Sequence, residues 1–327
     1  MSVALFSACE AVMACAQHVR IDDARLDRMA ETAPPHLLAI PTWQQEPGGF
    51  SGHADDAITW IVTVNAINFS YWPRAGQSRW FTQTNGQIVG QDDEALGVMA
   101  ALGQAIRSGV PLGDWRWLAQ MERDELAAIL APAPGAGPLP MLEQRLVALH
   151  DLAGAQRRFG SPPALFEASR GSAVRFVELL TQSAPCWSDV QQYGEITIPF
   201  HKRAWLCAAM IFGRFQHDPI RAFHDPENIP VFADYRLPQL LRGSGVLVLS
   251  DALAARIDAL EPLAEDSPEE IELRAAAVVA AARLREKLGA IHGVAPMHLQ
   301  VDHFLWRTAV QVDDQLPPFH RTRTIRY

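Results

Sequence analysis

The amino-acid sequence predicts a mostly α-helical protein, a helical bundle with one small β-hairpin insert. Apolar residues recur at three- and four-residue spacing, the period of an amphipathic helix, along most of the 327 residues. Strand signal is confined to 79–90, where Asn85 and Gly86 separate two short apolar runs, as in a hairpin. Because 49% of the residues are hydrophobic, the chain can build a large core.

The predicted helices follow one another along the whole chain, at 1–30, 54–72, 93–108, 141–158, 172–183, 201–215, 237–260, 268–288 and 297–311. The clearest start signal is "SPEE" at 267–270. Ser267 caps, Pro268 takes the first helical position and Glu270 closes a capping box, while Gly289 marks the stop. The Pro/Gly/Ala-rich 131–140 reads as an exposed connector. We expect one domain spanning 1–327; whether the connector divides it into two helical lobes stays open.

The charge balance limits the partners that the chain can have. A formal net charge of -9 argues against an extended nucleic-acid surface, which needs a basic face to displace counterions. A small anionic ligand in one local pocket remains compatible with it. Apolar runs stay short of the roughly 18 residues of a membrane span. The first twenty residues have no basic leading segment and carry Glu10, which favours an amphipathic helix over a signal peptide.

Motifs for metals and cofactors are absent from the sequence. His217 and His224 lie seven residues apart, outside any HExxH or Cys/His framework. The sequence contains neither GxGxxG nor GxxxxGK[ST]. Four cysteines without a CxxC pair indicate reduced, buried thiols. We therefore expect a cytoplasmic monomer with no metal, no cofactor, no membrane contact and no stable nucleic-acid partner.

The stretch "VFADYRLPQLLR" (231–242) places one carboxylate, Asp234, inside an apolar run. Asp234 is either the N-cap of the following helix or a functional carboxylate. Because residues before a proline avoid the helical region, the helix is expected to begin at Pro238. Asp234 would then lie one step outside it and would not be fully committed to capping.

Polar residues also interrupt the apolar stripe of 53–73. Asn65, Phe69 and Trp72 share one helical face with aliphatic residues, and Asn68 lies beside it. Buried amides are costly unless they are hydrogen-bonded. The side chains of the two asparagines either hydrogen-bond to neighbouring backbone inside the core or line a pocket. In such a pocket they would hydrogen-bond to a polar heterocycle, and the aromatic rings would stack on it.

Two charged residues in other predicted helices raise the same choice. Asp302 shares a face with Leu299 and Trp306, so it either pairs with an arginine or accepts hydrogen bonds from a ligand. Lys202 opens the helix at 201–215 in a chain whose only other lysine is Lys287. It is either a surface lysine or a point contact for a phosphate or carboxylate.

Six segments together resemble the queuosine salvage protein family, the queuosine 5′-phosphate N-glycosylase/hydrolases. They are "WIVTVNAINFSYWP" (60–73), "SAVRFVELL" (172–180), "FHKRAWLCAAMIF" (200–212), "FADYRLPQLL" (232–241), "VDHFLWR" (301–307) and "HRTRTIRY" (320–327). The resemblance implies a fold similar to the helical core of helix-hairpin-helix DNA glycosylases. In those enzymes a lysine opens the second helix of the hairpin and an aspartate precedes a later helix; Lys202 and Asp234 fall on these positions.

The resemblance implies hydrolysis of the N-glycosidic bond of queuosine 5′-monophosphate, which releases queuine for tRNA modification. A carboxylate beside C1′ would stabilise the positive charge that builds on the sugar as the base leaves. Asp234 fits this role, with Lys202 as the second catalytic residue. Whether Asp234 activates water or bonds covalently to the sugar stays open.

Further residues are implied to bind the substrate. Asp302 would accept hydrogen bonds from the 7-deazaguanine N–H groups, and Phe232 would line the base pocket. The remaining expected contacts are His53, Asn68, Phe69, Trp72, Tyr235, His303 and Trp306. Lys202, Arg321 or Arg323 would hold the 5′-phosphate.

Two other functions compete with hydrolysis of a nucleotide. One is a non-catalytic helical module that binds a modified nucleobase or tRNA, and the other is a DNA glycosylase. The acidic net charge counts against tRNA and DNA as partners.

Overall fold

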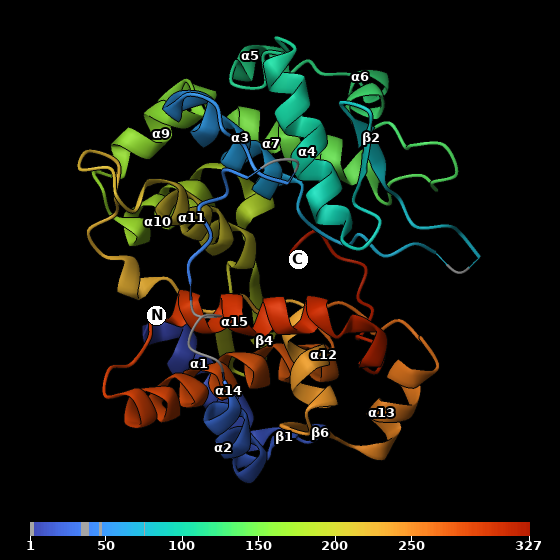
Figure 1. Cartoon of the computed structure of the whole chain (residues 1–327), viewed down its shortest axis with the longest axis vertical. Helices are drawn as coiled ribbons and strands as arrows, with labels where there is room; N and C mark the ends of the chain where they lie inside the picture. Colours follow the sequence, from blue (N-terminus) through green and yellow to red (C-terminus); the bar gives the residue numbers. More distant parts are fainter. Residues whose placement is uncertain (1–2, 34–38, 46–47, 75) are drawn as a thin grey trace.

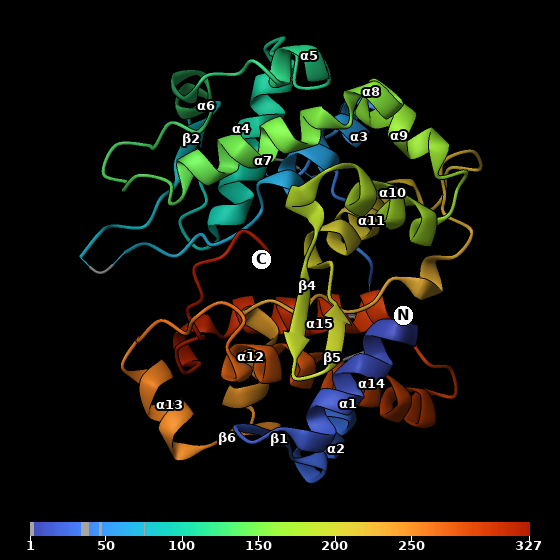
Figure 2. The same ribbon diagram turned by 180° about the vertical axis from the view of Figure 1, so that it is seen from behind.

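Two hydrophobic cores organise the helices of the molecule (Figures 1 and 2). The computed structural model describes residues 3–33, 39–45, 48–74 and 76–327. Within them the protein is mostly helical, which confirms the predicted fold class. We call the cluster around α3 (Ala54–Ala66) and α11 (Lys202–Phe215) the first core, and the cluster around α14 (Pro268–His292) the second core.

Helix α3 lies at the centre of the first core and is buried from Ala57 to Ala66. It packs against α4, α7, α9 and α11. The helices of this part are α3 (Ala54–Ala66), α4 (Glu94–Arg107), α5 (Trp115–Leu118), α6 (Arg123–Ile129), α7 (Leu142–Gly154), α8 (Gln156–Phe159), α9 (Pro162–Ala168), α10 (Ala173–Ser183) and α11 (Lys202–Phe215).

Helix α14 lies at the centre of the second core, where it contacts α1, α2, α12 and α15. Its residues 275–282 are all Ala or Val and all buried, because small side chains let the surrounding helices approach closely. The helices of this part are α1 (Val3–Cys15), α2 (Asp23–Thr32), α12 (Arg236–Gly243), α13 (Asp251–Asp258), α14 (Pro268–His292) and α15 (His298–Gln311). Short 3-10 helices are η2 (Pro185–Trp187), η3 (Pro226–Asn228) and η4 (Asp313–Gln315).

In the described residues, strands form only two-stranded antiparallel pairs. The predicted hairpin is confirmed as β2 (Thr82–Thr84) and β3 (Gln87–Val89), with positive φ at both Asn85 and Gly86. Two pairs escaped the sequence analysis. They are β4 (Val190–Tyr193) with β5 (Ile196–Pro199), and β1 (Val19–Ile21) with β6 (Leu247–Leu249).

The single helix predicted over 1–30 is wrong, because the chain breaks into α1, β1 and α2. The buried carboxylate of Glu272 accepts backbone N–H groups of Gln17 (3.0 Å), His18 (2.7 Å) and Val19 (3.0 Å). These bonds satisfy amides that a continuous helix would have used itself. A residue 253 positions or more away along the chain therefore fixes the break.

Two other helix boundaries differ from the prediction. Residues 237–260 form α12, β6 and α13 instead of one helix, since the chain turns at Gly245, whose φ of +77° favours glycine. Helix α14 continues past Gly289 and ends at Gly293, which adopts the left-handed conformation. Gly289 instead leaves room for Ala295, whose Cβ would lie 2.8 Å from an added Cβ.

The proline-rich residues 131–140 run beside the strand that leads into the hairpin. Ala133 N–H donates to Phe81 O, and Gly137 N–H donates to Arg79 O, each at 2.9 Å. Leu139 belongs to the first core. The stretch thus packs within one part of the fold. The division of the chain into one or more domains stays a prediction.

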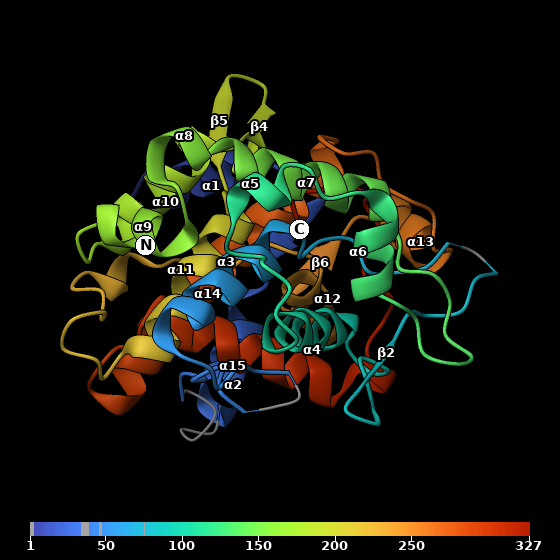
Figure 3. The same ribbon diagram turned by 90° about the horizontal axis from the view of Figure 1, so that it is seen from above.

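The C-terminal segment ends in the middle of the molecule, between the two cores (Figures 1 and 3). Ser70 N–H donates to Tyr327 O at 2.9 Å on the side of the first core. The Tyr327 hydroxyl donates to Glu270 of α14 at 2.6 Å on the side of the second core. Ser267 accepts the Glu270 N–H as predicted. The Ser267 N–H, however, donates to Ala264 O, and the Glu270 carboxylate accepts the Tyr327 hydroxyl, so only half of the predicted capping box forms.

None of the described helices combines the length and apolar character needed to cross a lipid bilayer. Among the same residues, no cluster of three or more His, Cys, Asp or Glu side chains is arranged to hold a metal ion. Cys9, Cys186 and Cys207 are buried free thiols, whereas Cys15 is exposed, so its predicted burial is wrong.

Gly97 of α4 sits where the hairpin approaches the helix most closely. An added Cβ would lie 2.8 Å from Trp80 Cζ3 and 3.1 Å from Val89 O. We expect Gly97→Ala to lower the free energy of unfolding by about 1–2 kcal/mol, because overpacking outweighs the gain in helix propensity. Gly154→Ala, where an added Cβ meets open space, should instead raise it by up to about 1 kcal/mol. Urea denaturation of both variants checks this, and equal stabilities would contradict the close packing.

Candidate active site

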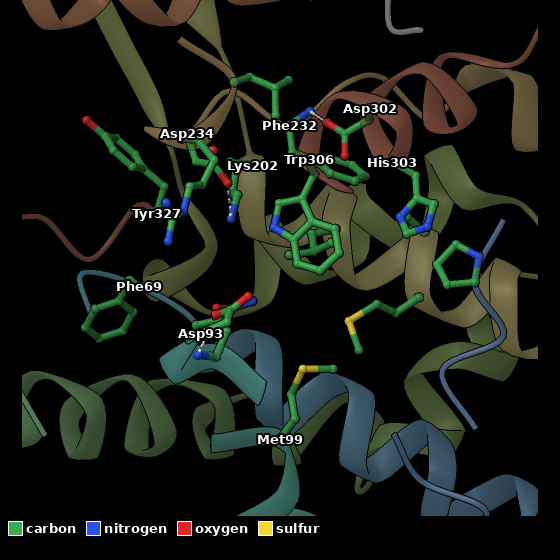
Figure 4. Close-up of a pocket in the computed structure, with 18 of the residues that line it drawn as sticks. Phe69, Asp93, Met99, Lys202, Phe232, Asp234, Asp302, His303, Trp306 and Tyr327 are labelled. Carbon is green, nitrogen blue, oxygen red and sulfur yellow. Dashed lines mark hydrogen bonds and ion pairs between the residues drawn. The ribbon is translucent and has the colours of Figure 1, made fainter. Parts of the chain in front are cut away.

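A cavity lies between the two cores, and side chains from both line it (Figure 4). Its empty space, counted together with the open mouth, is about 950 Å³. The first core contributes the segment after α3, the start of α4 and one face of α11. The second core contributes the segment before α12 and one face of α15. Most of the predicted site residues line it: Asn68, Phe69, Lys202, Phe232, Asp234, Tyr235, Asp302, His303 and Trp306.

Two buried arginines end helix α3 and direct the next residues to the cavity. Arg145 donates to the carbonyls of Ile67 and Phe69, and Arg203 donates to those of Asn65 and Ala66. The last carbonyls of a helix lack partners within it, and these guanidinium groups supply the donors. The helix predicted to run to residue 72 therefore ends at Ala66.

The two asparagines of this region have different surroundings. Asn65 donates to Ile61 O at 2.9 Å and contacts Met210, so its side chain bonds inside the core, as the structural interpretation expected. Asn68 lies beyond the helix and lines the cavity beside Phe69. The Phe69 ring is fixed by Arg145, whose guanidinium carbon is 4.5 Å from the ring centroid.

Asp234 and Lys202 form an ion pair at the cavity, with Oδ2 and Nζ 3.2 Å apart (Figure 4). Their side chains are 15% and 7% exposed, so the pair is largely shielded from water but open to the pocket. The other oxygen of Asp234 accepts the Arg236 N–H at 2.8 Å. Helix α12 begins at Arg236, two residues before the predicted Pro238. One carboxylate oxygen thus serves the helix start, and the other faces Lys202.

A buried guanidinium holds the backbones of both members of this pair. Arg274 Nε donates to Ala233 O at 2.9 Å, next to Asp234. Its terminal nitrogens donate to both oxygens of Asp189, at 3.0 and 2.7 Å, and Asp189 accepts the Lys202 N–H at 3.0 Å. Burial alone would raise the pKa of Asp189, but Arg274 and the Lys202 N–H hold it below its ordinary value. This carboxylate also compensates the cations at the start of α11.

Asp302 is a buried carboxylate without an arginine partner among the described residues, so of its two interpretations the internal salt bridge is wrong. Its Oδ1 accepts the Phe232 N–H at 2.7 Å. Burial raises the pKa of Asp302 well above its ordinary value; the Asp234 charge adds to the rise, while the Phe232 N–H and Lys202 oppose it. A ligand that brings N–H donors would satisfy this buried carboxylate.

Aromatic rings form much of the remaining wall. His303 and Trp306, one turn apart on α15, stack with their centroids 5.8 Å apart. Tyr235 stacks on Phe319 of the C-terminal segment at 4.6 Å. Burial, with a smaller effect of the Arg307 charge, lowers the pKa of His303 to about 4, so its ring is neutral at pH 7. Such a wall suits a flat heterocycle between rings.

Two predicted site residues are not among the residues that line the cavity. His53 is exposed and lies directly before the first residue of α3, whereas Asn68 and Phe69 lie after its last residue. At the usual helix rise, the 13 residues of α3 separate these two ends by about 20 Å. Trp72 is buried beneath Arg323, whose guanidinium carbon is 3.6 Å from the ring centroid. Arg321 lies over the same ring at 5.6 Å. The two arginines proposed for the phosphate therefore surround Trp72 instead of lining the cavity.

Other lining residues were missed by the sequence analysis, among them Asp93, Arg236 and Tyr327. Asp93 is the N-cap of α4, and its Oδ1 accepts the Ala95 N–H at 3.0 Å. The sequence signal for Asp93 was an Asp directly before an apolar-periodic run. That signal identifies a cap, but it does not show that the cap faces a cavity.

Comparisons with known proteins relate most of the chain to one family. The family model described as queuosine salvage protein matches residues 50–327. The queuosine 5′-phosphate N-glycosylase/hydrolase of Sphaerobacter thermophilus is 33% identical over 95% of this chain and 94% of its own length. The proteins of that name from Mus musculus and Schizosaccharomyces pombe are each 26% identical, over 94% and 83% of this chain and the same shares of their own.

Proposed function

The chain belongs to the queuosine salvage protein family, and we propose that its cavity hydrolyses the N-glycosidic bond of queuosine 5′-phosphate. The bond between C1′ and the base nitrogen breaks, its electron pair leaves with the base, and a water oxygen bonds to C1′. One proton of that water ends on the leaving nitrogen, and queuine and ribose 5-phosphate are the products. The observation that carries this proposal is the Asp234–Lys202 pair, which lines the same cavity as Asp302, a carboxylate without a cation partner among the described residues.

Asp234 stabilises the positive charge that develops on C1′ and the ring oxygen as the base departs. Its carboxylate is held on two sides, by the Arg236 N–H and by Lys202, so little reorganisation is needed when the charge forms. The same group takes the proton of the attacking water, or bonds to C1′ in an intermediate that water then cleaves. Lys202 orients the carboxylate in either course.

Asp302 recognises the base by accepting hydrogen bonds from its ring N–H and amino groups. A carboxylate matches two adjacent donors, and charge-assisted hydrogen bonds are the strong ones. Phe232, whose N–H holds Asp302 in place, and Trp306 flank the base. Phe69 and Asn68 close the cavity from the first core.

The direct test is incubation of the protein with queuosine and with its 5′-monophosphate, side by side, with chromatographic measurement of free queuine. Release from the monophosphate supports the proposal, and the ratio of the two rates measures how much the phosphate contributes. If neither compound releases base but either binds, the protein is a binding module for a modified nucleobase.

We expect Asp302→Asn to lower kcat/KM for queuosine 5′-phosphate by about 10- to 100-fold, because an amide presents an N–H where the base also presents one. Asparagine can still accept the Phe232 N–H, so the fold should persist. Steady-state kinetics measures the loss. Thermal unfolding supplies the control. If Asp302→Asn loses activity and its Tm also falls by a large amount, the loss reflects the fold, which would contradict a role in binding.

The pH dependence of the same variant separates binding from folding. The folded pKa of Asp302 lies above its unfolded value, so the stability it contributes is present at low pH and lost as the pH rises through the folded pKa. Asp302→Asn should therefore be at least as stable as the wild type at neutral pH. Conversely, kcat/KM of the wild type should fall as the pH drops through that raised pKa, and Asp302→Asn should lack this titration.

We further propose that the chain acts as a cytoplasmic monomer of one domain, without a cofactor or stable nucleic-acid contact. The acidic net charge and the buried free thiols support this. Tight, salt-sensitive binding of tRNA in a gel-shift assay would favour a tRNA-binding module instead. Cleavage of damaged duplex DNA would favour a DNA glycosylase.

A further inference from the structure

Asp93 places another carboxylate at the cavity, on the side formed by α4. Figure 4 shows it near Phe69 and Met99, across the cavity from Asp234, Lys202 and Asp302. One of its oxygens caps α4 through the Ala95 N–H. Among the described residues it forms no ion pair, because the cations nearest to it have other partners. Arg79 binds Glu94 at 2.6 Å, and Arg236 binds Asp313 at 2.5 Å.

Tyr71 lines the same cavity, and its hydroxyl has no hydrogen-bond partner among the described residues. The residue is 4% exposed, and its hydroxyl is buried. A buried polar group without a partner is costly, so its persistence points to a ligand that supplies one. The charge of Asp93 is among those that act on this hydroxyl. Burial also raises the pKa of Asp93 itself, and the Ala95 N–H, Arg236 and Arg79 oppose this rise only in part.

The substrate of the proposed reaction has two parts that are rich in hydrogen-bond donors. The first is the guanine-like edge, whose ring N–H and amino groups donate hydrogen bonds to Asp302. The second is the C7 substituent, an aminomethyl group whose nitrogen carries a cyclopentenediol. A secondary alkylamine is protonated at neutral pH, so this substituent brings one ammonium and two hydroxyls. A desolvated carboxylate and a buried phenol are the groups that would bind them.

We propose that Asp93 and Tyr71 form the subsite for the cationic C7 substituent of the base, with Asp93 pairing with the secondary ammonium and Tyr71 with a hydroxyl. The inference rests on the proposed function and adds a reason for selectivity. A carboxylate left desolvated and unpaired penalises a base without the ammonium. The site therefore discriminates queuosine 5′-phosphate from guanine nucleotides with the same donor edge.

The test compares two substrates, queuosine 5′-phosphate and 7-deazaguanosine 5′-phosphate, which share the donor edge, the sugar and the phosphate but differ at C7. Asp93→Asn is the informative variant, since asparagine caps helices as well as aspartate does and keeps the bond to the Ala95 N–H. We expect it to lower the ratio of kcat/KM between the two substrates by about 10- to 100-fold. Tyr71→Phe should lower the same ratio by about 3- to 10-fold.

Asp92→Asn is the matched control, because Asp92 is exposed, adjacent in sequence and absent from the cavity wall. The ratio of kcat/KM between the two substrates should be the same for Asp92→Asn as for the wild type. If Asp93→Asn reduces kcat/KM by the same factor for both substrates, Asp93 acts only as the cap of α4 and the subsite is wrong. If the wild-type protein releases base from neither substrate, the proposed function fails, and the inference falls with it.

Discussion

Asp234→Asn should lower kcat for queuosine 5′-phosphate by about 10³-fold or more, while the protein stays folded and still binds its substrate. Removal of one preorganised group that faces transition-state charge commonly costs 10²–10³ in kcat, and Asp234 carries a full charge. In the wild type, Asp234 Oδ1 accepts the Arg236 N–H at 2.8 Å. The amide of asparagine keeps an oxygen for this bond, so the start of α12 should persist in the variant. Single-turnover measurement of queuine release, together with a binding assay, separates the chemical step from affinity.

Asp218→Asn is a control with the same local geometry. Asp218 also accepts the N–H two residues on, that of Ile220 at 2.8 Å, and pairs with a cation, Arg221, at 3.2 Å. It lies outside the cavity, so its replacement should leave kcat within about 2-fold of the wild type, as for surface changes away from special features. Near-native turnover by Asp234→Asn would remove Asp234 from the proposed mechanism.

The helical framework was predictable because it rests on local periodicity. Helices α4, α10 and α11 begin and end within about one residue of the predicted bounds, and the Asn85-Gly86 hairpin formed as its turn chemistry indicates. The boundaries that failed depend on distant residues. Glu272 interrupts the first helix from more than 250 positions away, and Arg145 ends α3 from the other side of the first core.

The same contrast applies to the candidate site. Asp302 and Lys202 stood out because each breaks a pattern of its own segment, and both do line the cavity. Asp93 and Arg274 sit in patterns with ordinary explanations, a helix cap and a long helix, so the sequence offered no reason to single them out. His53 was implied by the family resemblance alone, and it precedes α3 at the end opposite to Asn68 and Phe69, which line the cavity.

Arg274→Met should lower the free energy of unfolding by about 3–5 kcal/mol, because it leaves Asp189 buried and without its cation. The side chains of Arg274 and Asp189 are 0% and 4% exposed, so water cannot replace the lost guanidinium. The pKa of Asp189 lies below its ordinary value, so the stability it contributes is present above its unfolded pKa and lost as the pH falls through the folded one. The wild type should therefore lose stability on acidification, and Arg274→Met should lack that component in urea denaturation at several pH values.

Arg283→Met on the same helix is the matched control, since its pair with Asp23 is 40% and 59% exposed and should contribute only about 0–1 kcal/mol. Arg274→Lys tests the positioning role separately. A lysine keeps a positive charge beside Asp189 but loses the guanidinium N–H that donates to Ala233 O. Arg274→Lys should therefore be more stable than Arg274→Met, while its kcat stays below that of the wild type because Asp234 is displaced. If kcat follows stability in both variants, Arg274 holds the fold without positioning the catalytic pair. If Arg274→Met is no less stable than Arg283→Met, the buried network makes little net contribution to stability.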